Sequence, residues 1–241
     1  MKFDFDRRIA RAEELSKTYL ESSHLLGFYI QIARLQKSVF SQQPARIQDL
    51  MPFASNLARL TKPSGPEPPD QSTVLGISEE ALFRVWERDR TVTEGEWFLA
   101  RILLQPYAEY AADRGPLSFE GGGSACPFCG ARPVAGVLRG EGDGGKRSLI
   151  CSLCSTEWEF RRIVCPNCGE EDKEKLPVYV ASQMDHVRVE ACDTCRTYIK
   201  SVDLTRNGHA VPVVDELATV ALNIWAEDQD YMKLEPNLLG M

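Results

Sequence analysis

Eight cysteines constrain this chain more than any other feature, because every one belongs to a Cys-x-x-Cys pair. A tight turn between two such cysteines aims both sulfur atoms at one point, about 2.3 Å from each sulfur when zinc is bound. Four thiolates complete a tetrahedral site, so four pairs predict two sites. The pairs are Cys126 and Cys129, Cys151 and Cys154, Cys165 and Cys168, and Cys192 and Cys195.

An internal duplication predicts how the pairs combine. Cys-Pro-Phe-Cys-Gly at 126–130 is repeated as Cys-Pro-Asn-Cys-Gly at 165–169, an offset of 39 residues. The pairs at 151–154 and 192–195 are offset by 41 residues. A repeated unit of this length favours one complete site in each unit. The first predicted site is Cys126, Cys129, Cys151 and Cys154, and the second is Cys165, Cys168, Cys192 and Cys195.

Each repeated unit has the strand pattern of a zinc ribbon or a rubredoxin-like knuckle fold. Two short strand-like segments flank a turn between the cysteine pairs, and a third follows the second pair. These segments are residues 134–139, 146–150 and 156–160 in the first unit, and 178–181, 186–190 and 197–202 in the second. An aromatic residue of the third strand is expected to cover the site.

The flanks of this region have helical patterns. Cap residues and apolar periodicity predict helices from Asp4 or Asp6 to about Tyr19, and from Ser22 or Ser23 to about Val39. Further helices are predicted at 43–60, 78–90, 93–113 and 215–225, with a proline-rich loop at 62–70 and an extended tail at 235–241 lying on its own domain.

The predicted fold class is therefore α+β. A helical N-terminal domain precedes two tandem rubredoxin-like or zinc-ribbon units, and a C-terminal helix follows them. The predicted boundaries are 1–118 for the helical domain, 119–160 and 161–206 for the two units, and 207–241 for the C-terminal helix and tail.

Charge and hydropathy exclude several classes of partner. The net charge is −7, and residues 121–206 carry 12 basic and 12 acidic side chains, so the cysteine region lacks the basic surplus that nucleic-acid binding requires. No apolar run is long enough for a membrane helix. The N-terminal segment is too charged for a secretory signal, which favours a cytoplasmic protein and metal ligation over disulfides.

An enzyme is not expected. Four cysteines around each metal leave no open coordination position for catalysis. The three histidines, His24, His186 and His209, are dispersed and show no metal-binding spacing, so we interpret them as ordinary surface or packing residues. Zinc and iron both suit four thiolates, and the sites can be structural or redox-active.

The cysteine region resembles the bacterial formate dehydrogenase accessory proteins of the FdhE type. The resemblance is carried by Cys-Pro-Phe-Cys-Gly at 126–130, Cys-Ser-Leu-Cys at 151–154 with Glu157-Trp158, Arg-Arg-Ile-Val-Cys-Pro-Asn-Cys-Gly at 161–169, and Ala-Cys-Asp-Thr-Cys-Arg-Thr-Tyr-Ile-Lys at 191–200. Asp-Glu-Leu-Ala-Thr-Val-Ala-Leu at 215–222 and Pro-Asn-Leu-Leu at 236–239 extend it.

This resemblance implies a cytoplasmic maturation factor that is not an enzyme. It implies two bound metal ions, iron rather than zinc, with the eight cysteines as ligands. The implied partner is the catalytic subunit of a respiratory formate dehydrogenase, bound before export, and a homodimer is compatible with it. Two alternatives remain open: a zinc-ribbon module for nucleic acid or protein, and a rubredoxin-type electron carrier.

Overall fold

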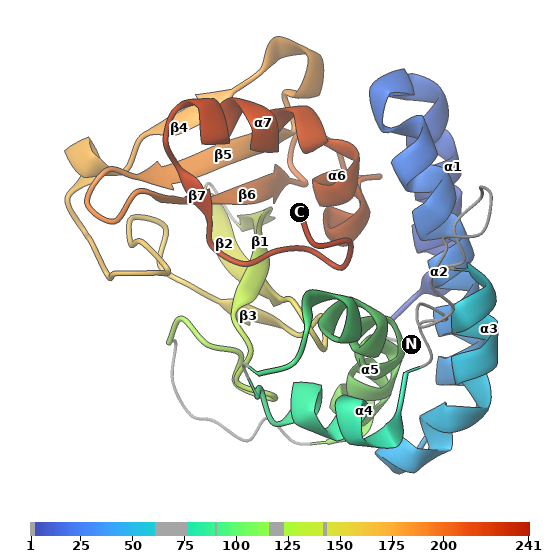
Figure 1. Cartoon of the computed structure of the whole chain (residues 1–241). Helices are drawn as coiled ribbons and strands as arrows, with labels where there is room; N and C mark the ends of the chain where they lie inside the picture. The colour runs from blue at the N-terminus through green and yellow to red at the C-terminus, as the bar shows by residue number, and fades with distance from the viewer. Residues whose placement is uncertain (1–2, 61–76, 90, 116–122, 142–143) are drawn as a thin grey trace.

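In the computed structural model, N-terminal helices pack beside a single mixed β-sheet that contains both cysteine-rich units (Figure 1). The structure describes residues 3–60, 77–89, 91–115, 123–141 and 144–241. The helices are α1 (Phe5–Thr18), α2 (Ser23–Ser41), α3 (Ala54–Leu60), α4 (Glu79–Trp86), α5 (Glu94–Arg114), α6 (Pro212–Ala218) and α7 (Val220–Asp228). The α+β fold class is confirmed.

The predicted helix starts depend on side-chain caps that the structure contains. The side chain of Asp4 accepts a hydrogen bond from the backbone N–H of Arg7 at 2.9 Å, and that of Ser78 accepts one from Ala81 at 3.1 Å. Thr93 and Glu96 form the predicted capping box of α5. The helix predicted at 43–60 is instead a 3-10 helix at Ile47–Phe53 followed by α3, because its internal proline has no N–H to donate.

The strands of the two units lie in the order β3-β2-β1-β6-β5-β4, and β7 pairs with β6. Within each unit the predicted hairpin is present, as β1 with β2 and β4 with β5, both antiparallel. The third strands are β3 and β6. The bounds are β1 (Pro133–Glu141), β2 (Gly144–Cys151), β3 (Glu157–Glu159), β4 (Val178–Val180), β5 (Val187–Cys192), β6 (Thr197–Asp203) and β7 (Met232–Lys233).

A parallel pairing of β1 with β6 joins the two units, a contact that the sequence patterns do not predict. Gly136 lies opposite Ser201 in this ladder, and a Cβ atom on Gly136 would be only 2.1 Å from the Ser201 hydroxyl oxygen. The glycine therefore permits the close approach of the two strands. Residues of both strands are buried on both faces, as is usual for the parallel centre of a sheet.

The predicted helix at 215–225 is two helices, and a buried lysine accounts for the break. Lys200 on β6 is fully buried, and its ammonium group donates to the backbone oxygens of Glu216 (2.6 Å) and Thr219 (3.1 Å). A cation is favourable at the C-terminal carbonyls of a helix. The Lys200 contact therefore stabilises the end of α6 at Ala218 and the start of α7 after Thr219.

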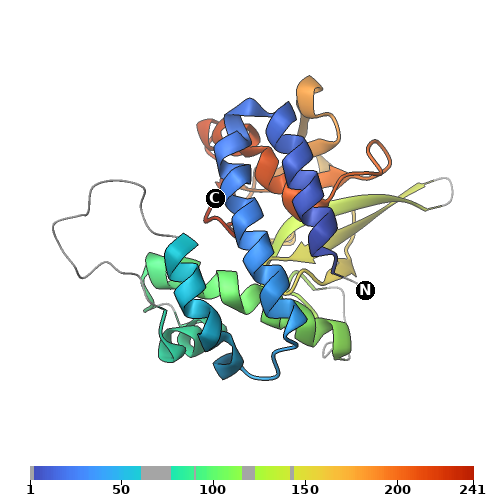
Figure 2. The same cartoon turned by 90° about the vertical axis from the view of Figure 1, so that its right-hand side faces the viewer.

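Buried ion pairs hold α1 against α5 within the helical half (α1–α5) and against α6 of the C-terminal half. Arg8 of α1 donates two hydrogen bonds to the fully buried Glu109 of α5, and Arg11 donates two to Asp215 of α6. Figure 2 shows α1 and α2 running side by side in front of the remaining elements. The helical half thus forms one wall of the molecule.

The C-terminal tail lies on its own chain, as predicted. Leu234 and Leu238 are buried, and the side-chain amide of Asn237 donates to Glu216 at 2.9 Å. The predicted loop at 62–70 and the predicted boundary between residues 118 and 119 lie outside the described residues. Among the described helices, none has the length and apolar character needed to cross a bilayer.

Candidate metal centres

The first cysteine pair of each repeated unit lies on a tight turn. The geometry of this turn follows from its Pro and Gly residues. The backbone N–H of Gly130 donates to the Cys126 oxygen at 2.8 Å, and that of Gly169 donates to the Cys165 oxygen at 3.0 Å. Both glycines have positive φ, +70° and +78°, which an L side chain disfavours. The repeated Cys-Pro-x-Cys-Gly sequence therefore forms the same knuckle twice.

The structure brings the cysteines together in the two predicted sets. Within each set, all four sulfur atoms lie within 4.8 Å of one another. The first cysteine group contains Cys126, Cys129, Cys151 and Cys154, and the second cysteine group contains Cys165, Cys168, Cys192 and Cys195. No histidine joins either group in the described part of the chain.

The sulfur geometry fits tetrahedral metal ligation. Sulfur atoms at the corners of a tetrahedron with metal–sulfur bonds of about 2.3 Å would be about 3.8 Å apart. The Cys165–Cys195 and Cys168–Cys192 sulfur distances are both 3.7 Å, while the Cys126–Cys154 and Cys129–Cys151 distances are 3.5 and 3.3 Å. All are far longer than a disulfide bond of about 2.05 Å, and all eight cysteines are free.

Backbone N–H groups around the sulfurs suit thiolate ligands. Phe128 donates to the Cys126 sulfur and Asn167 to the Cys165 sulfur, both at 3.4 Å, and Leu153 donates to the Cys151 sulfur at 3.3 Å. Hydrogen bonds of this kind stabilise negative charge on sulfur. The donor set of either group thus fits a bound iron or zinc ion.

The thiol pKa values show why a cation suits these groups. Burial raises the pKa of Cys192 to about 12, and burial raises that of Cys151 well above its usual range. Burial also opposes ionisation of Cys195, but hydrogen bonds from Thr197 and Asn167 lower its pKa to about 6. The four thiols of a group therefore do not ionise together without a partner charge, and a divalent metal supplies that charge by displacing their protons.

The first cysteine group is packed against the helical half. Trp158 of β3 is buried in the same apolar cluster as three of its cysteines, which confirms an aromatic cover from the third strand. Arg101 of α5 donates to the Ser152 oxygen at 2.6 Å, and the Ser155 hydroxyl donates to Glu109 at 2.6 Å. Helix α5 therefore contacts the Cys151–Cys154 knuckle directly.

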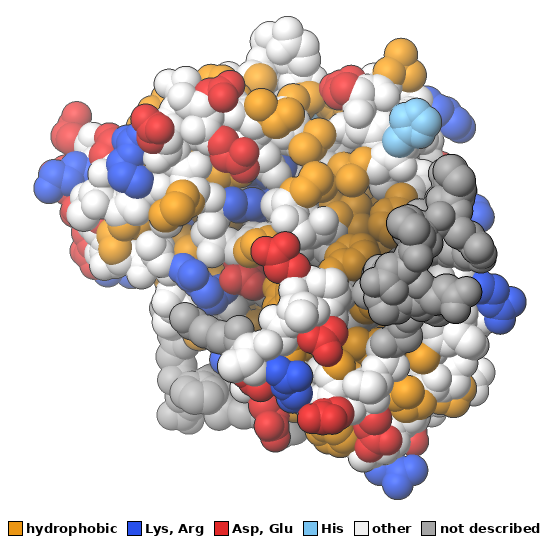
Figure 3. All heavy atoms as spheres, in the orientation of Figure 1, with side chains coloured by type: hydrophobic (Ala, Val, Ile, Leu, Met, Phe, Trp, Pro, Cys, Tyr) orange, Lys and Arg blue, Asp and Glu red, His pale blue; other side chains and the backbone are white. Residues whose placement is uncertain are grey.

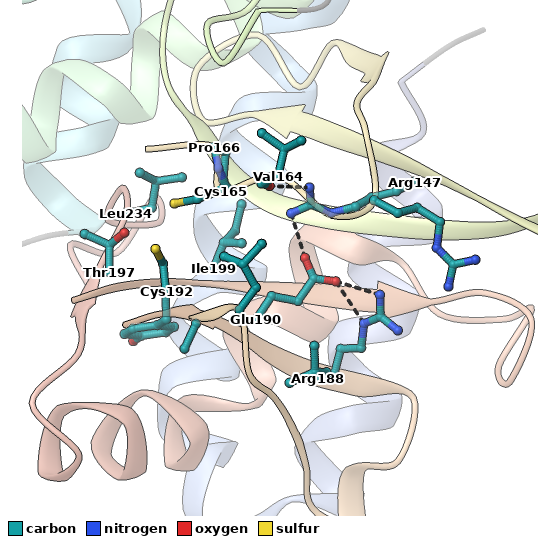
Figure 4. Close-up of a pocket in the computed structure, with 15 residues that line it drawn as sticks. Arg147, Val164, Cys165, Pro166, Arg188, Glu190, Cys192, Thr197, Ile199 and Leu234 are labelled. Carbon is teal, nitrogen blue, oxygen red and sulfur yellow. Dashed lines mark hydrogen bonds and ion pairs between the residues drawn. The ribbon is translucent and has the colours of Figure 1, made fainter. Parts of the chain in front are cut away.

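A charged cavity of about 60 Å³ lies beside the second cysteine group (Figure 4). Arg147 of β2 forms a 2.6 Å ion pair with Glu190 of β5, and Glu190 also accepts two hydrogen bonds from Arg188. The sulfur atoms of Cys165 and Cys192 lie together on the other side of this cavity (Figure 4). Arg147 thus connects the first unit with the surroundings of the second group.

Sequence reasoning identified the cysteines but missed the charged residues that support them. Arg101 of α5 lies between the buried apolar residues Ala100 and Ile102, and this isolated charge is the available signal. Glu109 and Arg147 have no such signal, because other polar or charged residues lie next to them or close by in the sequence. His186 is buried, as a packing histidine, and shares a 2.9 Å hydrogen bond with Asp215.

Comparison with known proteins finds one family over the cysteine-rich part of the chain. Residues 125–162 match the model of the FdhE central domain, and residues 163–239 match that of the FdhE C-terminal domain. An FdhE homolog from Aquifex aeolicus is 38% identical over 116 residues, 48% of this chain and 41% of that protein. One from Pseudomonas aeruginosa is 38% identical over 122 residues, 47% of this chain and 38% of that protein. These matches thus span about two fifths of the relatives' length.

The whole fold is also found in a solved structure. The crystal structure of the FdhE protein from Pseudomonas aeruginosa superimposes with a TM-score of 0.75 and 22% sequence identity, covering 98% of this chain and 95% of that one. A superposition at 22% identity establishes the fold alone. The matches to the two FdhE domain models cover both cysteine groups. Residues 125–239, which include both cysteine groups, therefore match the FdhE family in its central and C-terminal domains.

Proposed function

We propose that this chain is a cytoplasmic, iron-binding accessory protein that binds the catalytic subunit of a respiratory formate dehydrogenase before export. The observation that carries the proposal is the pair of four-cysteine groups, within the part of the chain that matches the FdhE family. Four thiolates per ion leave no position for a substrate, so the groups suit binding and folding roles better than hydrolysis.

Exposed apolar side chains near the second cysteine group support a protein partner. Ile163 is 52% exposed two residues before Cys165, and Val178, which lines the cavity beside Cys165 and Cys192, is 51% exposed. Met232, 66% exposed, lies opposite Thr197, whose hydroxyl contacts the Cys195 sulfur. Exposed apolar residues of this kind often mark protein contacts.

The surface charge supports a protein partner over nucleic acid. On the face drawn in Figure 3, acidic and basic side chains are interspersed rather than separated by sign. The formal charge of the whole chain is −7. Binding to a phosphate backbone needs a surplus of Lys and Arg, so a nucleic-acid role has no support in this charge distribution.

Co-purification of the catalytic subunit with the full-length chain tests the proposal. The double variant Cys165→Ser/Cys192→Ser removes one thiol from each knuckle of the second group, and Lys173→Ala, an exposed change in the same unit, is the matched control. We expect the intact protein and the control to recover the subunit and the double variant to lose it, because metal binding and folding of such units are coupled. Equal recovery by all three, or by none, would contradict the proposal.

The identity of the metal is tested separately. Protein purified without oxygen and then oxidised should absorb visible light if it holds iron with four thiolates, whereas zinc, with a filled d shell, gives a colourless protein. If protein purified from cells supplied with ample iron contained two equivalents of zinc, the iron assignment would be wrong. The co-purification experiment would still test the partner assignment.

A further inference from the structure

The two cysteine groups come from a duplicated unit, yet they differ in exposure. In the first group, Cys126, Cys151 and Cys154 are at most 1% exposed, and Cys129 is half-buried. In the second group, by contrast, Cys168 is exposed and Cys195 is half-buried. The same knuckle geometry thus leaves one cysteine of the second group, Cys168, exposed to solvent.

The helical half covers the first group. Phe128, between its first two cysteines, packs in a cluster that includes residues of α5, and Leu153, between its last two, packs there as well. The guanidinium of Arg88 donates to the Cys129 oxygen and lies 3.0 Å from the position that a Cβ atom on Gly130 would occupy. Reaching the sulfurs of Cys126, Cys151 and Cys154, each at most 1% exposed, requires separation of α5 from the sheet.

The second group lacks this cover. Asn167, Cys168 and Gly169 are all exposed, and a Cβ atom on Gly169 would meet no atom within 4 Å. The residues equivalent to Phe128 and Leu153 are the polar Asn167 and Thr194. The difference is therefore encoded in the sequence, at the variable positions of each Cys-x-x-Cys pair.

We propose that the two centres have different roles: the first cysteine group holds a structural ion, and the second cysteine group exchanges its ion with the surroundings through Cys168. This inference rests on the proposed metal binding. Exchange proceeds by ligand substitution, in which an incoming donor takes the place of the Cys168 thiolate and the freed thiolate takes up a proton. At the first group the same substitution needs a local opening of packed structure, which costs free energy.

Metal release from the full-length chain, reconstituted with two equivalents of zinc, tests this inference. A coloured zinc chelator in excess reports the release, and we expect two phases of one equivalent each, the first faster by about tenfold or more. Alkylation after the fast phase, followed by peptide mass spectrometry, should find label on Cys168 and Cys195 and none on Cys126, Cys151 or Cys154. This mapping needs no variant and so does not depend on the folding of a mutant.

A matched pair of substitutions extends the test. Phe128→Asn gives the first knuckle the polar residue of the second, and should accelerate the slow phase and leave the fast phase unchanged. Asn167→Ser, at the equivalent position, should leave the slow phase unchanged. Release of both ions in one phase, or earlier labelling of the first group, would overturn the inference. Failure of the chain to take up two zinc ions would instead overturn the proposed metal binding itself.

Discussion

Arg147 of β2 and Glu190 of β5 form a buried ion pair that joins the two cysteine-rich units at 2.6 Å. Arg147 is 2% exposed, and it also donates to the backbone oxygens of Arg161 at 3.0 Å and Val164 at 3.4 Å, in the segment that leads to Cys165. Figure 4 shows the contact with Val164. One side chain of the first unit therefore holds both the connecting segment and a strand of the second unit.

Substituting Arg147 by Met should destabilise the fold strongly. The change leaves Glu190 buried with Arg188 as its remaining cation, and breaking a buried pair costs about 3 kcal/mol. The free energy of unfolding from denaturant titration measures the loss. Arg139→Met, in the same hairpin, is the control, because its pair with Glu157 is exposed and contributes less than about 1 kcal/mol. Equal losses in the two variants would contradict this assignment.

Glu109 should couple the helical half to the first cysteine group. It is fully buried, binds Arg8 and accepts a 2.6 Å hydrogen bond from Ser155, the residue after Cys154. We expect Glu109→Gln to lower the free energy of unfolding by about 3 kcal/mol and to hasten metal release from the first group. Glu13→Gln, which affects an exposed pair with Arg34, should change neither. Unaltered release from Glu109→Gln would count against the coupling.

Stability should depend on pH through Glu216. Although burial opposes its ionisation, Lys200 and Lys233 lower its pKa to about 2 from an ordinary value of 4.5. The folded-state pKa lies below the unfolded value, so the ionised carboxylate stabilises the fold above about pH 4.5, and this contribution is lost as the pH falls towards 2. Burial lowers the pKa of Lys200 only to about 8, so Lys200 stays protonated in this range.

The measurement is the unfolding free energy of Glu216→Gln and of the parent chain between pH 6 and pH 3. The variant should be less stable by about 3 kcal/mol at pH 6, and the difference should shrink as the pH falls. Comparison at each pH cancels the effect of acid on the cysteine groups, which both proteins share. A difference that stays constant with pH would show that Glu216 is not the titrating group.

The sequence predicted those features that depend on local chemistry. The Cys-x-x-Cys turns, the hairpins and the caps at Asp4, Ser78 and Thr93 depend on residues close in the chain, and the structure contains them. The duplication also predicted how the cysteines are grouped, because a repeated unit of about 40 residues is expected to hold one complete site. The sulfur contacts within a group accordingly join cysteines 22 to 30 positions apart.

The features that sequence did not predict depend on distant contacts. The parallel pairing of β1 with β6 joins residues 65 positions apart, such as Gly136 and Ser201, and no local pattern encodes it. The break between α6 and α7 depends on Lys200, which lies outside both helices. The buried pair of Arg8 with Glu109 also depends on the tertiary fold, since each residue alone is typical of an exposed helix face.

The chain should have no turnover of its own on formate. The proposed role is accessory, and both cysteine groups would fill the coordination sphere of their ions. Anaerobic metal-loaded protein with formate and an artificial electron acceptor should reduce the acceptor no faster than buffer, and a purified formate dehydrogenase is the positive control. Activity that depends on metal, in a preparation free of that enzyme, would contradict the accessory role.

The central claim is that two metal ions are held by the two cysteine groups, and native mass spectrometry of anaerobically purified full-length chain tests it most directly. The account predicts a mass that corresponds to the chain plus two metal ions, with one ion lost in Cys165→Ser/Cys192→Ser and the other retained. A chain that carries no metal, or a double variant that still carries two ions, would contradict it.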